Sequence, residues 1–357
     1  MKKKHITILG SFKNGEIAFD GQTSKTRNYS EEICSHYSDC IVYKIDTQAG
    51  LRVLISHLII VFYRLLSSDI VFILPGKRGI KKILPIVFLF KKIKRYLLLY
   101  PVVGGWLPDY IKDYPMLQRM LHSVDRIYVE TKQMKSNLEK MNYSNVELAP
   151  VFTRRTASQN SKWNCLQRPY SLCTFSRVTP TKGIDTAIEA INRLNQDAND
   201  CKYTLSIYGK IDPDYKDAFL GAISNSAFNA IQYGGALDDN EVMDKLASHW
   251  IMLFPTRYPG EGFPATVLEG MMAGLPIIAS DWKYNSEIIE DGYNGLLFDL
   301  ESKENGLIEK IKYLSENQDI VISMHNNSLE KAKRFSPAVV LEPMFTLINT
   351  FLNRDHK

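Results

Sequence analysis

Short apolar runs alternate along this chain with longer segments in which apolar residues recur at every third or fourth position. In the first half the apolar runs predict strands, at residues 5–9, 41–45, 70–74, 96–100, 126–129 and 146–149. The periodic segments between them predict helices, at residues 27–36, 51–66, 116–122 and 131–141. Thr131 is the predicted N-cap of the last helix. This alternation is typical of α/β folds with parallel sheets.

A polar stretch over residues 153–168 interrupts the pattern, which then restarts. The stretch is rich in Ser, Asn, Gln and Arg, the composition of an interdomain linker. Beyond it the same reasoning predicts strands at 170–175, 203–208, 230–233, 250–254 and 276–279. It also predicts helices at 184–194, 214–224, 240–247 and from Pro264. A chain of 357 residues exceeds the size at which one hydrophobic core keeps growing, so two domains are expected.

The last apolar helix, predicted at residues 337–352, follows a second domain that is already complete. Such a helix needs a surface to cover, and we expect it to pack back on the first domain. The predicted domains are therefore residues 1–155 together with 337–357, and residues 168–334.

Charge is distributed unevenly along the chain. Residues 1–150 contain 23 Lys and Arg against 13 Asp and Glu, whereas the rest contains 21 against 26. Much of the excess lies in residues 77–99, where basic residues flank an apolar stretch. This pattern favours peripheral contact with an anionic membrane surface. A buried helix or strand with solvated lysines at its ends is the alternative. A nucleic-acid partner is disfavoured, because the patch has few aromatic residues and no recognition motif.

Cysteine, histidine and hydropathy patterns narrow the class of protein further. The five cysteines form no CxxC pair, which favours a reduced, cytoplasmic protein. The seven histidines form no HxxxH or HExxH motif, so no metal site is predicted. The first apolar run, Ile6–Leu9, is far shorter than the roughly 7–15 residues of a signal sequence. No apolar run approaches the roughly 20 residues of a membrane-spanning helix, so we expect none.

The segment from Phe254 to Asp281 carries the clearest chemistry. A strand ends in a turn rich in Pro and Gly, and a helix then runs from Pro264 to Gly274. Such a connection aims the free N–H groups of a helix N-terminus beyond the strand ends, where anions and sugar hydroxyls bind.

Two carboxylates stand out in this segment. Glu261 precedes the helix, and Glu269 is its only charged residue among Ala, Val, Leu, Met and Gly. Because a carboxylate is costly to bury without hydrogen-bond donors, a sugar diol would account for both positions. The alternatives for Glu269 are a solvent-facing turn and a buried ion pair.

These residues resemble a known family. Glu261-Gly262-Phe263-Pro264 followed by Glu269 resembles the E-x7-E signature of the family-4 retaining glycosyltransferases of GT-B fold. SLCTFSRVTPTKGIDTAIEAI, which contains Arg177 and Lys182, is similar to a strand–Arg–Lys-Gly–helix element of that family. PVVGGWLPDYI and YVET resemble the branch that builds bacterial capsule, exopolysaccharide or lipopolysaccharide. The resemblance implies two Rossmann-like domains that face each other across a cleft.

The resemblance also implies roles for single residues. Arg177 and Lys182 would hold the diphosphate of a nucleotide-sugar donor, and Glu269 its ribose. Glu261 would hold the hexose, together with the backbone amides of Gly262, Phe263 and Ala265. Catalysis is thereby assigned to Glu261, Arg177 and Lys182.

Further donor contacts are expected at strand ends. Gly209 and Tyr233 follow or end strands of the second sheet and would flank the nucleotide. Gly21-Gln22-Thr23 resembles the glycine loop that closes over the phosphates, with a long polar turn as the alternative. Where many members have a histidine, this chain has Gly104-Gly105, and glycine lets a ligand approach the backbone closely. The nearby His122 lies in a helical segment and is interpreted as structural.

The function implied is transfer of a hexose from a nucleoside-diphosphate sugar, with UDP favoured over GDP, to a glycan acceptor. The acceptor is expected to be lipid-linked, the anomeric configuration retained, and the enzyme a metal-independent member of class EC 2.4. Asp212-Pro213-Asp214 could be read as a metal-binding DxD motif, but its proline favours a surface turn. We expect the protein in the cytoplasm, at the inner face of the membrane.

Alternative interpretations assign the chain to other classes of protein. One is a catalytically inactive glycosyltransferase-like subunit that binds a partner. Another is a nucleotide-sugar epimerase or a phosphorylase on a similar fold. A dinucleotide oxidoreductase is disfavoured, because no G-x-G-x-x-G follows a predicted strand.

Overall fold

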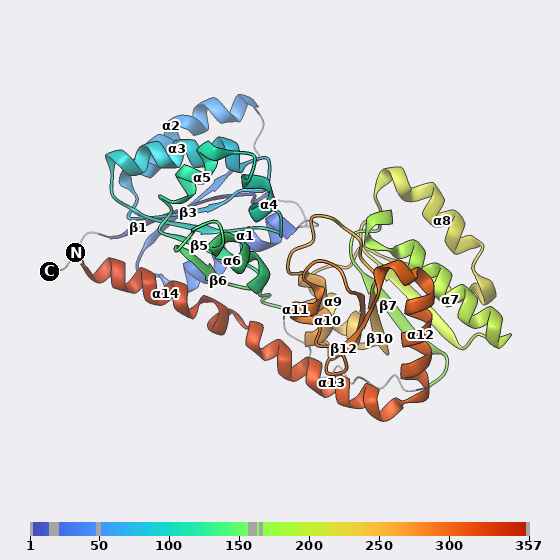
Figure 1. Cartoon of the computed structure of the whole chain (residues 1–357). Coiled ribbons are helices and arrows are strands. Elements are labelled where there is room, and N and C mark those ends of the chain that lie inside the picture. Colours follow the sequence, from blue (N-terminus) through green and yellow to red (C-terminus); the bar gives the residue numbers. More distant parts are fainter. Residues whose placement is uncertain (1–2, 14–20, 48–50, 156–162, 164–166, 355–357) are drawn as a thin grey trace. The chain divides into compact units, whose positions relative to one another are not determined.

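The chain folds into two compact units in the computed structural model, which describes residues 3–13, 21–47, 51–155, 163 and 167–354 (Figure 1). Unit 1 consists of Met1–Phe152, Gly260–Phe263 and Pro337–Lys357. Unit 2 consists of Thr153–Pro259 and Pro264–Ser336. The chain thus leaves unit 1 at the start of the predicted linker, most of which lies outside the described residues.

Unit 1 is built on a parallel sheet of six strands in the order β2-β1-β3-β4-β5-β6. The strands are β1 His5–Gly10, β2 Ile41–Asp46, β3 Ile70–Leu74, β4 Leu97–Pro101, β5 Arg126–Val129 and β6 Val146–Leu148. All six are confirmed predictions, with ends shifted by at most one residue. Every residue of β3 and β4 is buried, as expected of central parallel strands with helices on both faces.

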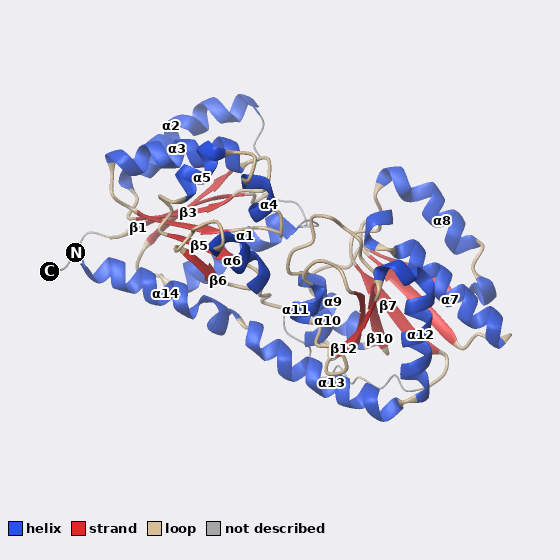
Figure 2. Ribbon diagram, viewed as in Figure 1, coloured by secondary structure: helices blue, strands red, loops and turns tan. Residues whose placement is uncertain are grey.

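The helices of unit 1 lie on either side of this sheet (Figure 2). They are α1 Gly21–His36, α2 Leu51–Ser67, α3 Ile80–Ile93, α4 Leu107–Ile111, α5 Pro115–Leu121 and α6 Lys132–Glu139. The hydroxyl of Thr131 accepts a hydrogen bond from Met134 N at 3.2 Å, which confirms the predicted N-cap of α6. The basic segment 77–99 is helical over α3, and α4 is a helix that the apolar pattern does not predict.

The C-terminal helix α14, Pro337–Arg354, packs on unit 1, as predicted (Figure 1, red). Leu341, Met344 and Ile348 are buried in the same core as the residues of β1, β3 and β4. The Phe345 ring also stacks on His36 of α1, with centroids 4.0 Å apart. The core of unit 1 is therefore completed by the far end of the chain.

One helical stretch, Gln318–Asn353, is long and apolar enough by length and composition to cross a membrane. It consists of α13, Gln318–Ala332, and of α14, with extended backbone at Ser336 between them. Leu341, Met344 and Ile348 of α14 are buried in the core of unit 1, and a core helix can meet the same criterion.

Unit 2 is built on a second parallel sheet, with the order β12-β11-β10-β7-β8-β9. Its strands are β7 Tyr170–Phe175, β8 Tyr203–Tyr208, β9 Ile231–Gly235, β10 Ile251–Phe254, β11 Ile277–Ser280 and β12 Gly295–Phe298. Its helices are α7 Ile184–Ala198, α8 Lys216–Ser224, α9 Val242–Ala247, α10 Ala265–Met272, α11 Asn285–Ile288, α12 Lys303–Glu316 and α13. The strands predicted in this half are confirmed; β12, α11, α12 and α13 are not among the predicted elements.

The core of unit 2 explains why these helices form where they do. Apolar residues of α7 recur with helical spacing, and Ile184, Ile188 and Ile191 are buried against Leu205 of the sheet. Helix α12 packs beside α7 on the same face, through Leu307 and Ile311. Both units are thus Rossmann-like, with parallel strands whose carboxyl ends share one edge.

Candidate active site

The carboxyl edge of the sheet in unit 2 carries four of the predicted site residues. Arg177 follows β7 by two residues, and Lys182 ends the short 3₁₀ helix Pro180–Lys182 that leads into α7. Gly209 follows β8, and Tyr233 lies in β9. Because all these strands run parallel, their ends meet where ligands of open α/β sheets bind.

The loop that carries Lys182 is fixed against the loop after β10. Gly183 has a φ of +71°, and a Cβ there would lie 1.9 Å from the carbonyl oxygen of Pro255. Arg257 N donates to the Thr181 carbonyl at 2.8 Å, which joins the same two loops. Only glycine permits this approach, so the sequence Lys-Gly has a structural reason.

Arg177 and Lys182 face one aromatic ring. The Arg177 guanidinium carbon lies 5.8 Å from the centroid of Tyr258, and the Lys182 Nζ lies 5.2 Å from it. Arg177 is exposed and Lys182 half-buried. Two cations held at one strand edge form an anion-attracting arrangement of the kind that holds phosphates. Tyr258 was missed by the sequence analysis, because a lone tyrosine in a turn gives no signal.

Gly209 and Tyr233 are locked together rather than free to move. The Tyr233 hydroxyl donates to the Gly209 carbonyl at 2.9 Å. Gly209 has a φ of +136°, and a Cβ there would lie 1.7 Å from the carbonyl oxygen of Ser176. These contacts tie the ends of β7, β8 and β9 to one another. Their predicted contact with the nucleotide stays a prediction.

Helix α10 begins and ends where the sequence predicts. Pro264 is its N-cap, and Gly274, just beyond the C-cap Ala273, has a φ of +79°. Glu269 is buried on this helix, only 5% exposed, among Val267, Leu268 and Met271. Ala265 is its first residue, so its amide is one of the N–H groups at the helix N-terminus that the helix itself does not satisfy.

Glu269 forms an ion pair with Arg155, whose guanidinium also pairs with Asp239. The buried ion pair considered as an alternative for Glu269 is therefore present. Burial raises the pKa of Glu269 to about 7, against the lowering effect of the Arg155 charge. Arg155 was missed, because nothing in Thr-Arg-Arg at residues 153–155 distinguishes it from Arg154.

The remaining predicted hexose contacts belong to unit 1. Gly260–Phe263 groups with this unit, and Glu261 is buried there. Phe263 N donates to Glu130 Oε2 at 3.1 Å, and a Cβ on Gly262 would lie 2.5 Å from the same oxygen. That Cβ would also lie 2.8 Å from Gly105 N. The backbone that approaches the glycine pair 104–105 in this structure is therefore that of Gly262.

Beneath this backbone lies a buried ion pair. Lys25 Nζ and Glu130 Oε1 are 2.7 Å apart, and both side chains are almost fully buried. Lys25 also donates to the Val102 carbonyl, and Gly104 N donates to Glu130 Oε1 at 3.2 Å. Sequence reasoning missed the pair, although the YVET stretch that resembles the family contains Glu130.

The prediction of a glycine loop at Gly21-Gln22-Thr23 is wrong in its local structure. The three residues form the first turn of α1, which begins six residues earlier than the periodicity predicts. Gln22 Nε2 donates to the Leu74 carbonyl at 3.2 Å, and the Thr23 and Ser11 hydroxyls lie 2.9 Å apart. Contacts with the ends of β3 and β1 thus favour a helix here over a loop. Their role in donor binding stays a prediction.

Other candidates lie in structural positions. His122 follows α5 and stacks on Tyr143, with centroids 4.3 Å apart. Asp212 accepts a hydrogen bond from Asp214 N at 3.2 Å and caps a short 3₁₀ turn, as a surface turn would. Among the described residues no group of three or more His, Cys, Asp and Glu side chains is arranged to hold a metal ion.

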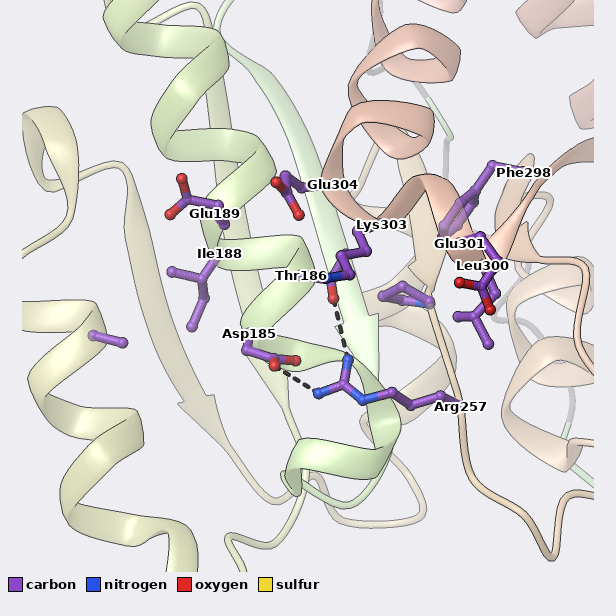
Figure 3. A pocket seen from close by; sticks show the side chains of 12 residues that line it. Asp185, Thr186, Ile188, Glu189, Arg257, Phe298, Leu300, Glu301, Lys303 and Glu304 are labelled. Carbon is purple, nitrogen blue, oxygen red and sulfur yellow. Dashed lines mark hydrogen bonds and ion pairs between the residues drawn. The ribbon is translucent and has the colours of Figure 1, made fainter.

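A pocket of about 700 Å³ lies on the face of unit 2 between α7 and α12 (Figure 3). Its lining includes four carboxylates, those of Asp185, Glu189, Glu301 and Glu304. Arg257 donates to Asp185 at 2.6 Å at its edge. The lining contains none of the predicted site residues, and its carboxylates would repel a diphosphate. We therefore assign no donor role to this pocket.

The family described as glycosyl transferases group 1 matches residues 158–335, which lie within unit 2. The match covers just under half of the chain. The glycosyl transferase domain therefore contains Arg177, Lys182 and Glu269, together with the loops that hold them.

Relatives of known name agree with this assignment. An uncharacterized glycosyltransferase of Methanocaldococcus jannaschii is 32% identical over 213 residues, 59% of this chain and 56% of the relative. The amylovoran biosynthesis glycosyltransferase AmsK of Erwinia amylovora is 27% identical over 204 residues, 54% of this chain and 47% of the relative. The matches thus span about half the length of these relatives.

Similarity in fold extends beyond the segment that matches the family. The crystal structure of Anabaena HepE in complex with UDP and glucose has a TM-score of 0.74 and 14% identity, covering 97% of this chain and 100% of that one. The chain therefore has the GT-B glycosyltransferase fold over nearly its whole length, as predicted.

Proposed function

We propose that this protein transfers a hexose from a nucleoside-diphosphate sugar, UDP in preference to GDP, to a hydroxyl of a glycan in bacterial surface polysaccharide synthesis. The observation that carries the proposal is the pair of cations, Arg177 and Lys182, facing Tyr258 at the strand edge of a group 1 domain. A relative that acts in amylovoran biosynthesis and a fold neighbour solved with UDP and glucose support the pathway and the donor.

In this proposal the two cations stabilise the leaving diphosphate. Transfer of a glycosyl group passes through an oxocarbenium-like state, so catalysis depends on holding the leaving group and orienting both substrates. Arg177 and Lys182 supply positive charge without a metal ion. Glu261 and the amides of Gly262 and Phe263 would hold the hexose, and Glu269 the ribose. We further propose retention of the anomeric configuration, in keeping with the family resemblance.

A ligand panel tests the proposal. The protein is heated with UDP, GDP, ADP, CMP or NAD, with and without magnesium. Nucleotide at about 100 times its Kd adds about 2.7 kcal/mol of stability, which is about 5–10 °C in Tm at about 2–4 °C per kcal/mol. We expect a shift with UDP that is the same with and without magnesium.

The variant Arg177→Ala tests the role of this site by its effect on the rate of transfer. Removal of one preorganised donor of this kind lowers kcat by about 10²–10³-fold. The exposed Arg334→Gln on the same unit is the matched control and should behave as wild type. Absence of any shift with nucleoside diphosphates would favour the inactive, partner-binding subunit instead. Loss of activity in EDTA would contradict metal independence.

We also propose that unit 1 lies on the inner face of the cytoplasmic membrane, next to a lipid-linked acceptor. Ile59, Phe62, Tyr63 and Leu66 are exposed on α2 with the spacing of a single helix face. Leu89 and Ile93 are exposed on α3, and Phe62 packs edge-on against Phe90 of α3, with centroids 4.8 Å apart. These six exposed residues form the α2–α3 apolar surface.

Basic residues border the α2–α3 apolar surface. Lys81, Lys82, Lys92 and Arg95 are exposed on α3 and just beyond it. Residues 70–108 contain no Asp or Glu at all. Apolar side chains bordered by cations match the boundary between acyl chains and anionic headgroups. Because of this charge complementarity, we propose that anionic lipid covers the α2–α3 apolar surface.

A further inference from the structure

We propose that Arg155 is a positioning residue of the donor site, whose guanidinium holds the Glu269 carboxyl group in place for the ribose diol of the donor. The inference rests on the proposed function, which gives Glu269 to the ribose. It adds a residue from outside the matched family segment, since that segment begins at residue 158.

The geometry is that of a bridge between two carboxylates. One terminal nitrogen of Arg155 donates to Glu269 Oε1 on α10, and the other donates to Asp239 Oδ1 in the turn after β9. The three residues come from three separate parts of unit 2. A planar guanidinium fixes both partners in direction as well as in distance. Replacement by a shorter neutral side chain would therefore release both.

The bridge uses only part of the hydrogen-bonding capacity of Glu269. Arg155 bonds to a single oxygen of Glu269, and an ionised carboxylate offers about four lone-pair sites. Two hydroxyl groups of a ribose can thus donate to Glu269 while Arg155 stays bound. The side chain of Glu269 is 6% exposed, that of Arg155 is 25% exposed and that of Asp239 is 69% exposed. The accessible end of the bridge is therefore on the Asp239 side.

The positive charge of Arg155 acts on the pKa of Glu269. Burial raises the pKa of Glu269, the Arg155 charge lowers it, and the Asp239 charge raises it, to about 7 overall. Helix α10 packs against α9, α13 and β11, and the His325 ring of α13 lies 2.6 Å from the carbonyl oxygen of Gly274, beyond the C-terminal end of α10. Within the described residues, Arg155 and Asp239 are the charges that act on Glu269. Without Arg155 this lowering effect is lost, so the pKa of Glu269 would rise and a larger fraction of the carboxyl would be protonated at neutral pH.

The test compares wild type with Arg155→Gln, Arg155→Lys and the control Arg334→Gln. UDP affinity is measured calorimetrically from pH 6 to 9, and the Glu269 pKa by NMR of the ¹³C-labelled carboxyl without nucleotide. We expect the Glu269 pKa of Arg155→Gln to rise above that of wild type. If that pKa rises from about 7 to about 8, UDP binding at pH 7 should weaken about fivefold. Binding should recover toward pH 9, where the carboxyl is ionised again. Arg155→Lys should restore much of the wild-type profile.

The outcomes separate the inference from the function on which it rests. If wild type binds UDP and Arg155→Gln shows the same pH profile and the same Glu269 pKa, the inference is overturned and the function stands. If Arg155→Gln binds UDP more tightly, Arg155 competes with the ribose and the inference is also overturned. If wild type binds no nucleoside diphosphate, the proposed function fails, and with it the ribose role. Glu269→Gln should remove the pH dependence from both backgrounds.

Discussion

Two ion pairs that include a buried carboxylate join residues far apart in the sequence. Lys25 pairs with Glu130, 105 residues later, and Arg155 pairs with Glu269, 114 residues later. A buried charge is tolerated only when it is paired, because desolvation without a partner costs several kcal/mol. The two pairs differ in use. Lys25 and Glu130 hold backbone around residues 102–104, whereas Glu269 retains lone pairs that a ligand could use.

Lys25→Met should destabilise unit 1 by about 3–5 kcal/mol, because Glu130 is left buried without compensation. The double variant Lys25→Met, Glu130→Met should recover much of that loss, since no charge remains buried. Urea denaturation of each variant measures the difference. The exposed pair of Lys112 and Asp109 supplies the control, and Lys112→Met should change stability by less than about 1 kcal/mol. A small effect of Lys25→Met alone would contradict the argument.

At the scale of elements, parallel strands and the helices after them decide where chemistry is placed. Periodicity in the sequence locates the strands of both sheets except β12, and therefore the loops after β7, β8 and β10. It fails where tertiary contacts override local preference. The first turn of α1 was expected to be a loop, but Gln22 and Thr23 find partners at strand ends. The exposed apolar face of α2 was also missed, because exposure cannot be read from hydropathy.

The α2–α3 apolar surface predicts binding to anionic vesicles. We expect the protein to float with vesicles containing phosphatidylglycerol, but not with neutral phosphatidylcholine, and binding to weaken in 0.5 M salt. Lys82→Gln with Lys92→Gln should weaken binding about 20- to 30-fold, at about 1 kcal/mol for each charge. Lys216→Gln with Lys333→Gln removes the same charge from exposed positions of unit 2 and should have no effect. Equal losses in both variants would argue against this surface.

At the scale of the whole molecule, the chain crosses between its two units more than once. Unit 1 takes its core helix α14 from the far end of the chain and takes Gly260–Phe263 from the middle of the segment that forms unit 2. The covalent link between Phe263 and Pro264 therefore joins residues that group with different units. The predicted hexose contacts and the predicted diphosphate contacts are divided between the units in the same way.

Leu341→Ala tests how far unit 1 depends on its last helix. Leu341 is fully buried, and truncation of such a residue costs about 2–5 kcal/mol. We expect the Tm measured by calorimetry to fall by at least about 4 °C. Val339→Ala, an exposed position on the same helix, should stay within about 0.5 kcal/mol of wild type. An unchanged Tm for Leu341→Ala would show that α14 adds little to the core of unit 1.

Local patterns by themselves determined the strands other than β12, most helices and the loops that hold Arg177 and Lys182, because periodicity and turn residues act over a few neighbouring positions. The sequence also marked Glu269 as a carboxylate in need of a partner. Only the tertiary structure decided which partner it has, because a contact between residues 155 and 269 depends on how loops and helices pack. The same reason explains Lys25 with Glu130 and the helical first turn at Gly21. Such contacts are set by packing across the fold, which no local pattern contains.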